Sequence, residues 1–180
     1  MALVKLNIAR GVTGALSTSN YVQGGITHAS MWRMTSDLTG PVDPISANLE
    51  IVDTDGYASL GSDMTVSSGL WTFPTTGYWL IKAHGNLYFS GDSRHQHLTI
   101  NTTTDNSSYS LAASGYSSIA QVESNATQQH IDAEFIFDVT NTTNCKCKFG
   151  FENVTNSSVV LAGGSSASYT WFTFIRLGDT

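Results

Sequence analysis

The sequence predicts an all-β sandwich, and three observations lead to this prediction. About ten short segments rich in aromatic and β-branched residues are separated by turn residues, close to the 8 to 12-residue spacing of sandwiches and barrels. Hydrophobic residues make up 41% of the 180-residue chain, which is enough for a sizeable core. Charged residues make up 12%. A surface of Ser, Thr, Asn and Gly takes their place, which is typical of polar sheets rather than solvated helices.

The first 27 residues form a separate unit in this prediction. They contain short apolar clusters without a sustained hydrophobic period, so we expect an extended arm that becomes ordered against a partner. Residues 28–180 are expected to form the single folded domain. The apolar residues proposed to dock the arm are Leu3, Val4, Leu6, Ile8, Val12 and Tyr21.

The first half of the domain is predicted to contain short strands and one long strand. A rigid turn at residues 40–44 follows the first strand. Residues 78–89 are apolar on both faces at their start, which indicates an inner strand that is covered on each side. The expected strands are 30–35, 48–52, 61–68, 69–73 and 78–89.

In the second half, residues 131–139 alternate cleanly between an apolar and a polar face. Ile131 and Phe137 belong to the apolar face, whereas Asp132, Glu134 and Asp138 belong to the polar one. Residues 140–144 are expected to turn this strand back as a hairpin. The expected strands of this half are 94–101, 109–121, 131–139, 145–151, 159–162 and 168–177.

Two segments resemble a known family. In residues 69–89, GLWTFPTTGYWLIKAHGNLYF, Trp71 and Phe73 share one face of a strand, residues 74–77 form a Pro-centred turn, and an aromatic strand follows. This order resembles the globular-head (complement first component)/tumour necrosis factor jelly roll. Residues 169–177, YTWFTFIRL, resemble the last central strand of that family. The resemblance covers roughly residues 60–177 and implies an antiparallel jelly-roll β-sandwich.

The same resemblance implies a homotrimer, because that family forms three-fold trimers through an aromatic-rich sheet face. The last strand carries large residues on both faces. One face can fill the core, and the other then needs a cover that a second subunit would supply. The sequence does not select the face, so the candidate interface residues come from both: Tyr169, Trp171, Phe172, Phe174 and Ile175.

Charge and chemistry exclude several functions. Fourteen acidic and eight basic residues give a net charge of −6, so we expect neither nucleic acid nor anionic membranes as partners. No apolar run is long enough for a signal peptide core or a membrane span, which predicts synthesis in a host bacterial cytoplasm. Cys145 and Cys147 lie two apart on one strand face, which is unsuitable for a disulfide, and are interpreted as reduced core thiols.

No cofactor and no enzymatic activity are expected. A nucleophile triad assembled from a serine, His84 or His130, and Asp132 would lack the G-x-S-x-G elbow and a helix to carry it. His95 and His97 share one strand face and are weak candidates for a metal site. We interpret them as surface histidines without a metal.

The functional hypothesis is a bacteriophage virion structural protein. A jelly roll with a short docking arm, and without a collagen stalk, is similar to the small trimeric virion proteins of tailed phages. Its expected partners are itself and other virion proteins, such as the major capsid protein or a tail adaptor. The sequence does not separate capsid decoration from a short tail or head fibre.

The alternative is a receptor-binding head that recognises a host-surface glycan through loops. Aromatic rings can stack on sugars while neighbouring polar groups bind hydroxyls. The candidate ligand residues are His95, His97, Tyr109 and Tyr116.

Overall fold

The computed structural model describes residues 25–153 and 155–180, and this part of the chain is all-β. The six arm residues from Leu3 to Tyr21 lie outside the described residues. The strands are β1 (Ala29–Met34), β2 (Leu38–Thr39), β3 (Leu49–Ile51), β4 (Thr65–Ser67), β5 (Leu70–Thr72), β6 (Gly77–Phe89), β7 (Ser93–Thr103), β8 (Ser110–Ile119), β9 (Thr127–Val139), β10 (Lys146–Asn153), β11 (Val160–Leu161) and β12 (Trp171–Gly178).

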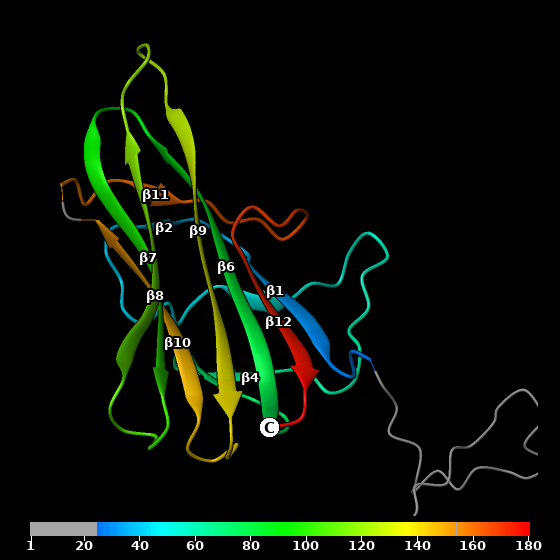
Figure 1. Ribbon diagram of the computed structural model, residues 1–180. Coiled ribbons are helices and arrows are strands. Elements are labelled where there is room, and N and C mark those ends of the chain that lie inside the picture. Colours follow the sequence, from blue (N-terminus) through cyan, green and yellow to red (C-terminus); the bar gives the residue numbers. More distant parts are fainter. Residues whose placement is uncertain (1–24, 154) are drawn as a thin grey trace, which may run out of the picture.

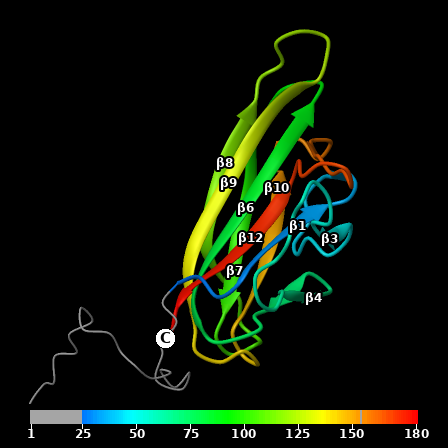
Figure 2. The same ribbon diagram turned by 90° about the vertical axis from the view of Figure 1, so that its right-hand side faces the viewer.

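The strands form two antiparallel sheets that face each other (Figures 1 and 2). Sheet A has the order β2-β11-β6-β12-β1-β3, with β9 on the other edge of β6, and sheet B has the order β4-β5-β10-β7-β8. The chain changes sheets six times, between β3 and β4, β5 and β6, β6 and β7, β8 and β9, β9 and β10, and β10 and β11. The predicted antiparallel jelly-roll sandwich is therefore confirmed.

Strands β6 and β9 are the longest strands of sheet A. Each contains 13 residues, and they pair along their full length from Gly77 opposite Val139 to Phe89 opposite Thr127. On β6 the odd-numbered residues from Gly77 to Leu87 are buried between the sheets. Because side chains alternate along a strand, the even-numbered residues of β6 form the outer face of sheet A.

Aromatic rings from both sheets fill the core. The ring of Trp71, on β5 of sheet B, lies 5.0 Å from the rings of Trp32 and Phe174 and 5.9 Å from that of Phe172, all on sheet A. Phe149 of sheet B stacks on Phe172 at 4.3 Å between ring centroids. Trp71, Phe149, Phe172 and Phe174 are completely buried. The two aromatic segments singled out in the sequence thus meet across the sandwich.

The observed strands differ most from the predicted ones at four places, one of which is β9, which begins at Thr127 rather than at residue 131. The predicted strand 61–68 shortens to Thr65–Ser67, and the final strand begins at Trp171 rather than at residue 168. Strand β2 was not predicted. It has two residues and pairs with the equally short β11, so it depends on a contact between segments far apart in sequence.

A buried arginine joins β1 to β3 and the loop that follows. Arg33 is 1% exposed, and its guanidinium donates to Glu50 Oε1 at 2.7 Å, Asp53 Oδ1 at 2.6 Å and Thr54 Oγ1 at 2.8 Å. Such a cation is tolerated in the interior when its donors are satisfied. Arg33 therefore connects β1 to the edge strand β3 and to the loop after it.

The two cysteines lie where the sequence predicts. Cys145 and Cys147 are free and fully buried, and burial raises the pKa of the Cys147 thiol far above its ordinary value. Both are therefore core residues.

Strand β8 lies against β9, so the two sheets approach each other closely along this edge (Figure 2). The approach requires a glycine, because a Cβ at Gly115 would collide with the carbonyl oxygen of Asp132.

Within the described residues, no helix has the length and apolarity needed to cross a bilayer.

We predict that Phe174→Ala lowers the free energy of unfolding by about 3 to 5 kcal/mol, because it leaves a cavity beside Trp71. Urea unfolding at one fixed protein concentration measures the change. Leu111→Ala is the control, since Leu111 is 59% exposed on β8. A loss below about 1 kcal/mol for Phe174→Ala would contradict the proposed role of the ring cluster.

Candidate functional site

The final strand resolves the question of which face is available for assembly. Phe172 and Phe174 are completely buried inside the sandwich, so assigning them to a subunit interface was wrong. Trp171 and Ile175 point to the outer face of sheet A and are partly exposed, and Tyr169, just before the strand, is 47% exposed. Of the five candidates, Tyr169, Trp171 and Ile175 remain.

An apolar row crosses four strands on this outer face. Ile136 on β9 lies opposite Leu80 on β6, Leu80 lies opposite Ile175 on β12, and Ile175 lies opposite Ala29 on β1. Directly opposed side chains on one face of a sheet are in contact distance. Ile136 is 57% exposed. We call these four residues the apolar row.

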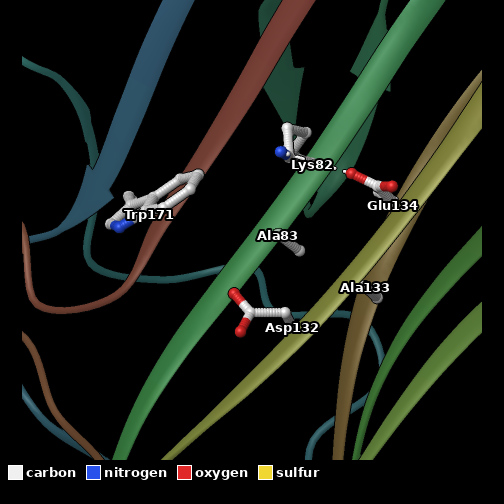
Figure 3. A pocket seen from close by; sticks show the side chains of 6 residues that line it. All are labelled: Lys82, Ala83, Asp132, Ala133, Glu134 and Trp171. Atoms are coloured by element: carbon white, nitrogen blue, oxygen red, sulfur yellow. Dashed lines mark ion pairs between the residues drawn. The ribbon is translucent and has the colours of Figure 1, made fainter.

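On one side of the apolar row the polar groups are paired within the chain, whereas on the other side Asp138 Oδ1 is buried without a hydrogen-bond partner in the described part of the chain. Lys82 lies 3.2 Å from Glu134, and His84 Nδ1 lies 2.6 Å from Asp132 Oδ1. The ring of His84 also stacks on Trp171, with centroids 5.1 Å apart. An open hollow of about 330 Å³ lies here, with Trp171 on one side and the two carboxylates of β9, Asp132 and Glu134, on the other (Figure 3).

Two members of the triad considered from sequence, His84 and Asp132, are in contact, and of these two Asp132 lines the hollow. His130 stacks on the other side of the His84 ring at 6.2 Å. The residues that line the hollow are Lys82, Ala83, Asp132, Ala133, Glu134 and Trp171, so this lining contributes no serine or cysteine nucleophile.

A second cluster lies on the outer face of sheet B. His97 on β7 lies between Glu152 on β10 and Tyr116 on β8 in one cross-strand row, and His95 is two residues away on the same face. The ring centroids of His95 and His97 are 4.2 Å apart, and Tyr116 lies 5.3 Å from His95 and 4.3 Å from His97. We call His95, His97, Tyr116 and Glu152 the histidine cluster.

Tyr109, the fourth candidate ligand residue, is separate from this cluster. It precedes β8, whereas Tyr116 lies near the end of that strand, about 23 Å away at the usual rise per residue. The ammonium of Lys148 lies 5.5 Å from the ring centroid of Tyr109. The four candidate residues therefore do not form one site.

Sequence reasoning missed Leu80, Ile136 and Glu152. Ile136 carried a signal, because it stands on the polar face of its strand among Asp132, Glu134 and Asp138. An isoleucine out of phase with its neighbours indicates a surface that is not simply solvated. The contact between Glu152 and His97 had no comparable signal, because it depends on the register between β7 and β10.

The sequence itself matches no protein-family model and no curated protein. Solved structures match in fold. Eiger TNF from S. frugiperda is 12% identical, with a TM-score of 0.59, and the match covers 84% of this chain and 93% of that one. Murine APRIL at pH 5.0 is 9% identical, with a TM-score of 0.57 and coverage of 83% and 98%. Murine APRIL at pH 8.5 has the same identity and coverage and a TM-score of 0.55. The chain therefore has the TNF-like jelly-roll fold.

The loop after β7 contains a carboxylate with strong local hydrogen bonds. Asp105 Oδ1 accepts from the backbone N–H of Ser108 at 2.8 Å, the hydroxyl of Thr103 at 2.7 Å and the backbone N–H of Ser107 at 2.9 Å. These bonds lower the pKa of Asp105 well below its ordinary value of 3.8.

Because the folded-state pKa is lowered, this carboxylate stabilises the fold above pH 3.8, and its contribution is lost as the pH falls through the lower folded-state value. We predict that Asp105→Asn destabilises the protein at pH 7 and that the difference from the natural chain shrinks toward pH 2. Urea unfolding at both pH values measures it. The exposed Glu123→Gln is the control, and an Asp105→Asn effect that grows in acid would contradict the assignment.

Proposed function

We propose that this chain is a homotrimeric jelly-roll protein on the surface of a bacteriophage virion, where it serves as capsid decoration or as a short fibre. In this proposal residues 1–27 anchor it to the particle. The observation that carries the self-association is the apolar row on the outer face of sheet A. The virion location rests on analogy with small trimeric phage proteins of similar build.

The apolar row favours an interface for a physical reason. Exposed apolar area is unfavourable by about 25 cal/mol for each Å², and a continuous row across four strands offers more such area than scattered single residues do. Leu177 lies on β12, the strand that contributes Ile175 to the row, and Tyr169 lies just before that strand; they are exposed by 46% and 47%. A copy of the same protein is the cover that closed symmetry supplies most simply.

The preference for three copies comes from the TNF-like fold and the sequence resemblance, because jelly rolls of that family trimerise through a sheet face. Lys82 is paired with Glu134 within the chain, so covering this ion pair leaves neither charge without a partner. His84 is hydrogen-bonded to Asp132. On the other side of the apolar row, Asp138 Oδ1 has no hydrogen-bond partner among the described residues of the single chain, so an interface over this face has to supply one.

A receptor-binding head remains the second candidate function. The exposed ring of Tyr116, 61% accessible, lies beside His95 on the other sheet, and such a ring is a suitable stacking surface for a sugar. This surface would stay free in a trimer formed through sheet A, so a virion component could also recognise a host glycan.

We predict a mass of three times 19.3 kDa for the purified chain by light scattering. Ile136→Glu should lower this mass toward that of the monomer, because it places a carboxylate at each of three covered positions. Ile136 is largely exposed in the single chain, so the variant should still fold. Leu111→Glu, with the same substitution at a similarly exposed position on sheet B, should leave the trimer intact. A monomeric natural chain, or an unaffected Ile136→Glu trimer, would refute the interface.

For the virion role, we predict that a chain lacking residues 1–27 keeps the oligomeric state of the full chain but no longer binds particles that lack this protein. Co-sedimentation with such particles measures the binding. Particle binding by the truncated chain would remove the anchor role. Copy number for each virion distinguishes decoration, with hundreds of copies, from a fibre, with a few dozen or fewer. Loss of host adsorption in the presence of excess purified protein, relieved by Tyr116→Ala, would instead support glycan recognition.

A further inference from the structure

The two imidazoles of the histidine cluster point nitrogen to nitrogen. His97 Nε2 lies 2.9 Å from His95 Nε2. We propose that His95 and His97 bind a divalent transition-metal ion through these two nitrogens, with Glu152 orienting the His97 ring and water completing the coordination.

The local backbone explains the convergence. His95 and His97 lie two apart on β7, so both point away from the core, while Gln96 between them is completely buried and donates to Ser93 Oγ. The pairing of β7 with β8 shifts register between Ser93 and Gln96. Such an irregularity re-aims the side chain that it contains. His95 thus tilts toward His97 instead of lying parallel to it.

Glu152 selects the nitrogen that His97 offers. Its Oε2 lies 3.4 Å from His97 Nδ1 across the β7–β10 pair. A carboxylate at this nitrogen favours the tautomer that carries the proton on Nδ1, which leaves the lone pair of Nε2 directed at His95. Carboxylate, imidazole and metal stand in this order in many protein metal sites.

The separation of the nitrogens suits a shared ion. At a metal–nitrogen distance of about 2.0 to 2.1 Å, two ligands at right angles lie ~2.9 Å apart and two tetrahedral ligands ~3.3 Å apart. Without an ion, an N–H on His95 Nε2 can donate to the lone pair of His97 Nε2. For both rings to bind an ion through Nε2, the proton of the neutral His95 ring moves to its Nδ1, so each imidazole keeps one proton and offers one lone pair.

The ligand set indicates the metal class. Imidazole nitrogens suit Zn²⁺, Ni²⁺ and Cu²⁺, whereas Ca²⁺ and Mg²⁺ require oxygen ligands. In the described residues no group of three or more His, Cys, Asp or Glu side chains could hold a metal ion, so this is an open site with two protein ligands. We expect weaker binding than in a closed four-ligand structural site, and the metal is not required for folding.

The test is calorimetric titration of the full chain, without a histidine tag, with Zn²⁺ or Ni²⁺ at about pH 7.5. We expect one ion for each chain and no binding of Mg²⁺. His95→Gln and His97→Gln should each weaken binding at least tenfold, and Glu152→Gln about tenfold. His130→Gln is the matched control, because His130 belongs to the other histidine pair, on sheet A. It should leave the affinity unchanged.

A readout on the natural chain covers the case in which a variant fails to fold. Imidazole NMR signals report tautomer and metal ligation directly. Those of His95 and His97 should shift on addition of Zn²⁺, while those of His84 and His130 should not. The proposal is overturned by absence of binding at millimolar Zn²⁺ and Ni²⁺, by shifts confined to other histidines, or by folded His95→Gln and His97→Gln variants that bind as well as the natural chain.

Discussion

The aromatic rings packed around Trp71 hold the two sheets together. Because the residues of this cluster point inward, they also determine which side chains of β10 and β12 point outward. Trp71 contributes one large buried surface that touches rings on β1, β10 and β12. Once Phe172 and Phe174 are committed to this cluster, the two-residue period directs Trp171 and Ile175 outward. The same period on β10 buries Phe149 and Phe151 and turns Glu152 toward His97. Both candidate surfaces are therefore consequences of how the core is packed.

Much of this arrangement could be predicted from local pattern, and the remainder depends on long-range pairing. The alternation of residues 131–139 predicts strand β9, and the corner at residues 74–77 predicts the turn from β5 into β6, because each of these signals lies within one segment. The last strand is apolar on both faces, so sequence alone could not say whether Phe174 or Ile175 lies inside. Tyr109 and Tyr116 are close in sequence and are therefore predicted to belong to one ligand region, but the extended strand β8 separates them by about 23 Å.

The two outer faces differ in chemistry, and this permits separate functions. Sheet A presents the aliphatic side chains of the apolar row next to the ion pair of Lys82 with Glu134. Sheet B presents two imidazoles, a phenol and a carboxylate in cross-strand contact. Association through sheet A would leave the histidine cluster exposed to solvent on every subunit. Metal binding is therefore compatible with the proposed assembly and does not depend on it.

The pairing of charges on sheet A also bears on what such an assembly would cost. An unpaired charge covered by another subunit is strongly unfavourable, and truncating one member of a buried pair costs several kcal/mol for the same reason. Arg33 lies in the same cross-strand row as His84 and Trp171. Its guanidinium donates hydrogen bonds to Glu50, Asp53 and Thr54 within the chain. Arg33 and Lys82 therefore need no counter-ion from a second copy, whereas Asp138, on the other side of the apolar row, needs a hydrogen-bond donor for its buried Oδ1. The attraction between copies would then come from the apolar row and Trp171, with the charges setting the borders of the contact. A face of this kind favours an interface that forms by burial of apolar area and depends only weakly on salt.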